Sequence, residues 1–127
     1  ALLMHLAATD RIYQINTFEG APLGKDLPDS YKEKWGVAME LGEPARQQIK
    51  GHDLDYYLNL LNETRERTLA EFRKRDDSWL MSVDKDWGWG PTNNYCKWFH
   101  VCEHESNHNG QIKLLKSRLP GAKQSSE

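Results

Sequence analysis

Residues 98–112 read WFHVCEHESNHNGQI, and the spacing of apolar and histidine residues in this stretch predicts a long helix. Three of the five histidines, His100, His104 and His108, lie in it at intervals of four residues. Residues four apart lie on one face of a helix, about one turn from each other. His104 and His108 can therefore offer their rings to one metal ion. His100 is two turns, about 12 Å, from His108, so one ion cannot take all three.

The two histidines fall within the apolar stripe of this predicted helix. At about 100° per residue, one narrow face carries Val101, His104, His108, Ile112, Leu115 and Leu119, with Glu105 at its side. Burying an imidazole without a hydrogen-bond partner is costly, and a bound metal ion is one way to satisfy it. The alternative is a pair of core histidines that bond to neighbouring groups or to water. The residues of this helix leave both possibilities open.

The letters His-Glu-Ser-Asn-His at 104–108 also match the zinc-protease motif H-E-x-x-H, in which Glu105 would be the general base. That motif needs a third ligand downstream. After His108 the chain has no histidine, and its only acid is Glu127. The match therefore does not predict a protease of this class, and a third ligand has to come from upstream.

His5 is the better upstream candidate for a third metal ligand. It lies in a helical stretch beside apolar residues, whereas His52 lies in a Gly-His-Asp turn. A histidine from one helix and a His-x-x-x-His pair from another would leave a coordination position open for water or substrate. Glu105 is a candidate general base or an acceptor for a ligating imidazole, and it also fits as an ordinary helix residue.

Two further long helices are predicted outside this stretch. Apolar spacing places them at 1–19 and 53–74, and the histidine helix extends over 92–119. The signals at their ends are Gly20 after the first, Asp53 before the second, and Thr92 before and Pro120-Gly121 after the third. Gly110 is unfavourable inside the third helix, and a close approach of a neighbouring helix would explain it.

The segments between these helices are expected to be largely irregular. The connection at 20–52 has room for helical turns at 29–35 and 44–49, and the segment at 75–91, rich in Trp and Gly, is typical of a loop. The fold class is therefore predicted to be all-α. Three long antiparallel helices would be one short of an up-down four-helix bundle.

The first helix of such a bundle would have to precede Ala1. Residues 1–8 already have the pattern of the middle of an amphipathic helix, and no cap residue comes before them. We therefore expect the first helix to be missing from this chain. A single helical bundle domain is expected over 1–121 and a mobile tail over 122–127.

Composition excludes several classes of function. A chain of 127 residues fits one domain, and a formal net charge of −2 argues against a general nucleic-acid binder. No stretch has the roughly 20 apolar residues of a membrane-spanning helix. The two cysteines, Cys96 and Cys102, do not form a disulfide framework, which indicates a reducing compartment and a cytoplasmic location.

Two segments of the chain resemble the DinB superfamily of small bacterial four-helix bundles. LLMHLAATD at 2–10 resembles the second helix of that family, whose histidine is a metal ligand, and 98–112 resembles its last helix, where His-x-x-x-His is followed closely by Gly-Gln or Gly-His. The resemblance implies a divalent metal ion, commonly nickel, zinc or iron, held by His5, His104 and His108. It also implies a first helix that this chain lacks.

Characterised relatives in that family include S-transferases and isomerases that use bacillithiol, mycothiol or glutathione. The resemblance therefore implies a thiol-dependent S-transferase, in which the metal lowers the pKa of a low-molecular-weight thiol. The thiolate would attack an electrophilic substrate in a pocket under the loops at 20–52 and 75–91. Metal-assisted hydrolysis with Glu105 as base, or a non-enzymatic bundle with a structural metal or none, are the alternatives. A homodimer is expected from family analogy alone.

Overall fold

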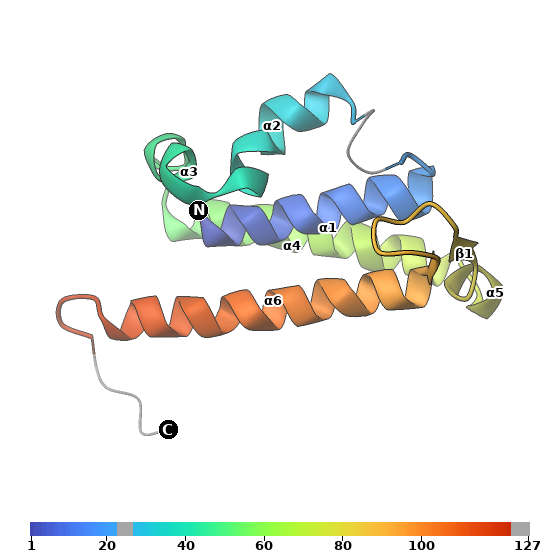
Figure 1. The fold of residues 1–127 in the computed structure, drawn as a ribbon. Helices are drawn as coiled ribbons and strands as arrows, with labels where there is room; N and C mark the ends of the chain where they lie inside the picture. Colours follow the sequence, from blue (N-terminus) through green and yellow to red (C-terminus); the bar gives the residue numbers. More distant parts are fainter. Residues whose placement is uncertain (23–26, 123–127) are drawn as a thin grey trace.

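The computed structural model describes residues 1–22 and 27–122, and these residues are mostly helical (Figure 1). The elements in chain order are α1 (Leu2–Glu19), α2 (Asp29–Glu40), α3 (Gly42–Gln48), α4 (Leu54–Arg73), α5 (Asp77–Leu80), β1 (Val83–Asp84), β2 (Thr92–Asn93) and α6 (Asn94–Ser117). The expected all-α class is confirmed. The predicted tail at 122–127 lies outside the described residues except for Ala122.

The directions of the long helices differ from the expected antiparallel arrangement. α1 and α4 run in the same direction, and α6 runs in the opposite one (Figure 1). The cause is the segment between α1 and α4, where α2 and α3 carry the chain back along α1 before α4 begins. The antiparallel prediction is therefore wrong for α1 and α4. The segments at 29–35 and 44–49, expected as short turns, form the helices α2 and α3, and these return the chain to the end of the molecule where α1 began.

Local signals at the helix ends explain where the long helices start and stop. Gly20 ends α1 in a left-handed conformation with φ 75°, and the Asp53 carboxylate caps α4 by accepting from the backbone N–H of Tyr56 at 2.9 Å. The cap of α6 is Asn93, whose side chain accepts from the N–H of Cys96, and not Thr92 as predicted. The Thr92 hydroxyl donates to the carbonyl oxygen of Gly90 at 2.8 Å instead.

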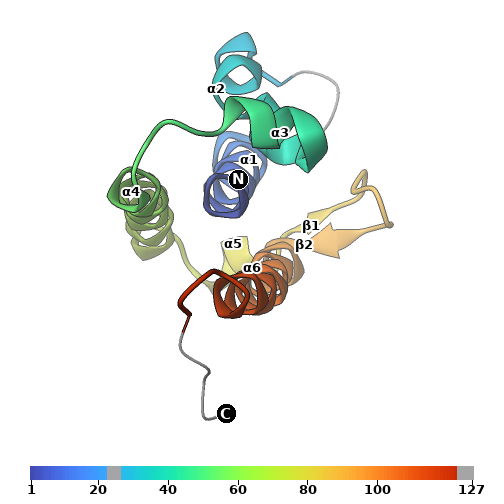
Figure 2. The same cartoon turned by 90° about the vertical axis from the view of Figure 1, so that its left-hand side faces the viewer.

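α1 is the central helix of the fold. Figure 2, seen along the long helices, shows α2 and α3 on one side of α1 and α4 and α6 on two others. Residues on every side of α1 are therefore buried, including Leu6, Ala7 and Ile15. Trp35 of α2 and Trp98 of α6 complete the core around it. The sequence predicted an amphipathic helix here, but α1 is buried on every side.

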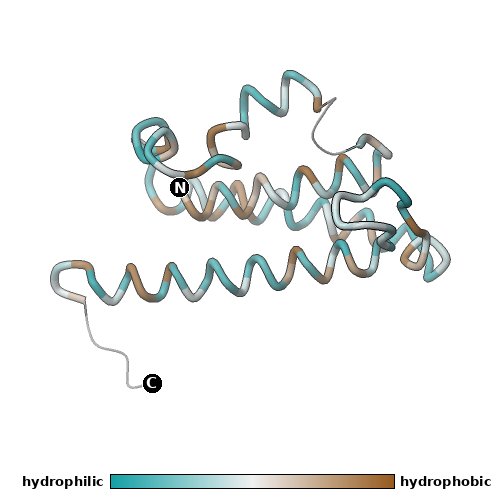
Figure 3. The backbone as a smooth tube through the Cα atoms, in the orientation of Figure 1, coloured by the Kyte–Doolittle hydropathy of each residue, from teal (hydrophilic) through white to brown (hydrophobic). Residues whose placement is uncertain are grey.

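The apolar stripes predicted for α4 and α6 are buried only in part. Leu115 of α6 is 58% exposed, Leu119, which lies beyond the end of α6 at Ser117, is 62% exposed, and Leu54 of α4 is 62% exposed. α6 extends past the beginning of α1 (Figure 1), so its last turns have no central helix to pack against. Figure 3 shows hydrophobic residues separated by hydrophilic ones along α6. No helix within the described residues combines the length and apolar character needed to cross a membrane.

The segment expected as a loop at 75–91 contains short regular elements. Asp76 caps α5 by accepting from the N–H of Trp79 at 3.0 Å. β1 and β2 pair in an antiparallel ladder that sets Val83 opposite Asn93. The loop prediction was incomplete because elements of two to four residues are too short to show a periodic sequence pattern.

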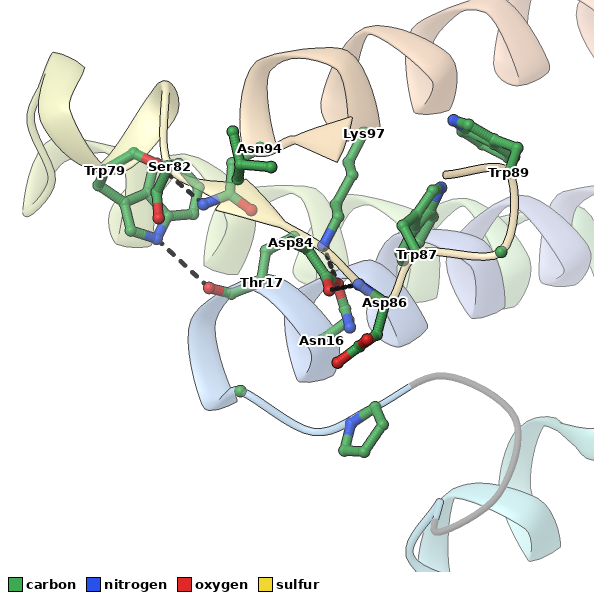
Figure 4. A pocket seen from close by; sticks show the side chains of 14 residues that line it. Asn16, Thr17, Trp79, Ser82, Asp84, Asp86, Trp87, Trp89, Asn94 and Lys97 are labelled. Carbon is green, nitrogen blue, oxygen red and sulfur yellow. Dashed lines mark hydrogen bonds and ion pairs between the residues drawn. The ribbon is translucent and has the colours of Figure 1, made fainter. Parts of the chain in front are cut away.

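Lys97 of α6 holds this hairpin against the end of α1 (Figure 4). Its ammonium donates to Asn16 Oδ1 at 2.9 Å and to Asp84 Oδ2 at 2.8 Å, and lies 4.3 Å from the centre of the Trp87 ring. Lys97 is only 2% exposed, so these partners compensate for the water that its charge has lost. The hydrogen bond from Lys97 also holds the pKa of Asp84 below its ordinary value.

Candidate metal centre

Three histidines from the two ends of the sequence converge in the structure. His5 lies near the start of α1, and His104 and His108 lie one turn apart on α6. His104 Nε2 is 3.0 Å from His5 Nε2 and 3.1 Å from His108 Nε2. The potential ligand atoms of the three residues all lie within 4.8 Å of one another. These three residues, which are the predicted ligand set, lie close enough together to hold one metal ion.

Hydrogen bonds on the far side of two rings fix their orientation. His5 Nδ1 lies 2.8 Å from the carbonyl oxygen of Ala38 in α2, and His108 Nδ1 lies 2.6 Å from Gln111 Oε1. These oxygens only accept, so each Nδ1 donates its hydrogen and each Nε2 directs a lone pair toward the cluster. Contacts of this kind orient ligating imidazoles in metal sites. His104 Nδ1 is buried without a hydrogen-bond partner among the described residues.

The three converging nitrogens are better arranged to bind a cation than to hydrogen-bond to one another. His5 and His108 both present lone pairs, and His104 Nε2 can donate a hydrogen to only one of them. The remaining contact then has no hydrogen between its two nitrogens, and the lone pair directed there is unsatisfied. Nitrogens bound at about 2.0–2.1 Å to one tetrahedral ion lie about 3.3–3.4 Å apart, which is close to the two separations in the cluster. The residues present therefore fit a divalent metal ion.

Burial keeps two of the imidazoles neutral. Loss of hydration lowers the pKa of His5, although the hydrogen bond to Ala38 opposes that shift. Burial, with a further contribution from the positive charges that His108 and His5 carry when protonated, lowers the pKa of His104 to about 4. Metal ions bind the neutral imidazole, so both shifts favour ligation at neutral pH.

Glu105, the candidate general base, forms an ion pair with Arg65 of α4. The same guanidinium donates from Nε to Asp10 Oδ2 of α1 at 3.1 Å. Burial disfavours the charge of Arg65, but its bonds to the two carboxylates outweigh this and raise its pKa above the ordinary value. Glu105 therefore lies next to the cluster with its carboxylate already engaged, and its role as a base stays a prediction.

The other two histidines of the chain lie outside the cluster. The ring centre of His100 is 5.2 Å from that of Trp89 and 6.4 Å from that of Tyr13, so His100 belongs to an aromatic group beside the site. His52 stacks on Tyr56 with ring centres 3.8 Å apart. Both positions agree with the interpretation that His5, and neither His52 nor His100, joins the pair on α6.

A cavity of about 610 Å³ lies under the loops where the electrophile pocket was expected (Figure 4). Asn16, Trp87 and Lys97 contribute to its lining, and none of the three clustered histidines does. Asn16 follows His5 by eleven residues, which is about 16 Å along α1. The cavity and the histidine cluster therefore have no lining residue in common, and the pocket expected for the electrophile stays a prediction.

No protein-family model matches the chain, and no curated protein matches it. The resemblance to the DinB superfamily thus rests on the two quoted segments alone. The geometry adds that the histidines of those segments meet in space.

Three polar residues around the site were not found from the sequence. The contact of Gln111 with His108 could have been predicted, because Gln111 follows His108 by three residues and so shares its helix face. Arg65 and Asp10 had none, since each is one of many charged residues and they lie 55 residues apart in the chain.

Proposed function

We propose that the protein is a metal-dependent, DinB-like bundle whose divalent ion is held by His5, His104 and His108. The observation that carries this proposal is the convergence of the three Nε2 atoms, two of them oriented by bonds from Nδ1 to Ala38 and Gln111. Imidazole ligands suit nickel, zinc and iron, the metals that the resemblance implies.

The number of ligands favours a catalytic ion over a structural one. Among the described residues, no fourth His, Cys, Asp or Glu joins the three-histidine group. Structural zinc sites are closed by four protein ligands, whereas catalytic sites keep a position for water or substrate. We therefore infer an enzyme rather than a bundle clamped by metal.

Thiol-dependent S-transfer is the reaction that we propose, because it is the chemistry implied by the DinB resemblance. A bound ion would lower the pKa of a low-molecular-weight thiol at its open position. The transfer joins the thiol sulfur to an electrophilic carbon of the second substrate and releases the leaving group together with the thiol proton. The contribution of the chain is to keep His5 and His104 neutral through burial, and to orient the rings of His5 and His108 through Ala38 and Gln111.

Hydrolysis at the same site is the alternative, and the position of Glu105 weighs against it. A general base needs a carboxylate that can reach and deprotonate a water molecule. The Glu105 carboxylate is paired with Arg65, so it would first have to leave that partner. The homodimer and the cytoplasmic location expected from the sequence stay predictions.

Metal content measured by elemental mass spectrometry tests the site directly. We expect about one ion per chain in the parent protein and a loss of metal in His5→Ala, His104→Ala and His108→Ala. His52→Ala and His100→Ala are matched controls and should keep the ion. Metal retained in His5→Ala would exclude that ligand, and a parent that takes up neither nickel nor zinc on dialysis would overturn the proposal.

Two assays on the metal-loaded protein separate transfer from hydrolysis. We expect adduct formation between 1-chloro-2,4-dinitrobenzene and one of the thiols glutathione, bacillithiol or mycothiol, and loss of this activity in His108→Ala. Cleavage of p-nitrophenyl acetate without added thiol, abolished in Glu105→Gln, would instead favour hydrolysis. Absence of adducts with all three thiols would contradict the proposed reaction while leaving the metal site in place.

A further inference from the structure

An ion-pair network joins all three long helices beside the histidine cluster. Arg65 of α4 donates to Asp10 of α1 and to Glu105 of α6. Among the ion pairs of the described residues, no other group of this kind links α1, α4 and α6. The side chain of Asp10 is 2% exposed and that of Glu105 33%, so the network runs from the core to the surface.

The network lies next to both halves of the cluster. Glu105 directly follows His104 on α6, and Asp10 follows His5 by five residues, about 7.5 Å along α1. The cluster is divided between these two helices, so the separation of its nitrogens depends on how α6 is set against α1. Arg65, which lies on the third helix α4, binds both α1 and α6 close to the histidines that these helices carry.

We propose that Arg65 is a positioning residue for the metal centre, because its guanidinium binds Asp10 and Glu105 together and so sets α6 against α1 at the spacing that the imidazoles need. This inference rests on the proposed metal site. Buried ion pairs add little net stability compared with apolar side chains, and fixing the register of packed elements is their best-attested use. Arginine suits this role because its planar fork presents several donors in a fixed geometry, whereas lysine carries a single point charge.

Arg65→Lys tests the inference because it keeps the charge and removes the fork. We expect the affinity for Zn²⁺, measured by competition with a chromophoric chelator, to fall about tenfold, the range found when groups that orient metal ligands are changed. The visible absorption of the Co²⁺-loaded protein should change as well. The matched control is Arg67→Lys on the same helix, whose partner is the exposed Glu19, and it should leave both unchanged.

A second variant keeps the inference testable if Arg65→Lys does not fold. Glu105→Gln leaves the pair between Asp10 and Arg65 in place, and we expect the same weaker binding and altered Co²⁺ absorption. A purely structural role would lower the free energy of unfolding of the metal-free variants in urea and leave affinity and spectrum as in the parent, and this result would overturn the inference alone. A parent that binds neither Zn²⁺ nor Co²⁺ would overturn the metal site and this inference with it.

Discussion

Among single residues, His104 is the one whose protonation the fold opposes most. Its ring centre lies 4.9 Å from that of His5 and 4.4 Å from that of His108, and its pKa is lowered to about 4, chiefly by burial. In the unfolded chain the same imidazole titrates near 6.5. Between about pH 6.5 and pH 4, the unfolded chain therefore binds more protons than the folded one.

We expect the metal-free protein to lose stability as the pH falls through this window. A base whose pKa is lowered by folding stabilises the folded state when it is neutral, and protons then favour the unfolded chain. Urea unfolding at a series of pH values measures the effect. His104→Gln removes the titrating group and should give a flatter pH dependence than the parent, and an equal slope in the two proteins would contradict the assignment to His104.

At the scale of elements, α6 contains a glycine that its packing does not require. The close helix approach expected at Gly110 is absent, since an added Cβ would meet no atom within 4 Å among the described residues. Glycine inside a helix is less favourable than alanine by about 1 kcal/mol. We expect Gly110→Ala to raise the free energy of unfolding in urea by about 0.5–1 kcal/mol, with unchanged Zn²⁺ affinity. A lower stability would mean that a neighbour occupies this position.

The hairpin after α5 depends on the buried ammonium of Lys97. Asp84→Ala would leave that charge buried without a counter-charge, a change that costs about 3–5 kcal/mol in buried pairs. Lys97→Met keeps the apolar stem and leaves Asp84, 32% exposed, to water, so we expect a smaller loss of about 1–3 kcal/mol. The double variant should then be more stable than Asp84→Ala alone in urea unfolding, and the reverse order would argue against a charged Lys97.

The ends of the long helices could be predicted because their signals are local. Gly20 and Asp53 act within one turn of the residues that they cap. Asn93 was missed as the cap of α6 because Thr92 beside it is also a common capping residue, and only the structure shows that the Thr92 hydroxyl donates to the Gly90 carbonyl oxygen. The parallel course of α1 and α4 was not predictable, because it depends on how far two marginal helical segments extend.

In the candidate site too, contacts between residues close in sequence could be predicted from spacing, whereas contacts between distant residues could not. The pair His104 and His108 follows from helical spacing alone, and their meeting with His5 required the upstream search and the family resemblance. Arg65 could not be found, because its two carboxylate partners lie 55 and 40 residues away in the chain. A charged residue on a helix rich in charges gives no sign of such partners.

At the scale of the whole molecule, the cluster connects the first helix of the chain to the last. His5 and His104 are 99 residues apart, and α1 packs against α6 along the core. An ion bound by both helices would bind the folded state and have no preformed site in the unfolded chain. The ion would therefore stabilise the fold as a unit, and its effect on unfolding reports whether the site spans both helices.

We expect Zn²⁺ at about 100 times its dissociation constant to raise the free energy of unfolding by about 2.7 kcal/mol, which for a chain of this size is a rise in Tm of about 10 °C. Scanning calorimetry with Zn²⁺, and again after a chelator, measures the shift and its reversal. His5→Ala retains the pair on α6 but not the link to α1, so its Tm should respond little to Zn²⁺. The same shift in His5→Ala as in the parent would place the ion on α6 alone, and the architecture proposed for the site would be wrong even if the protein binds metal.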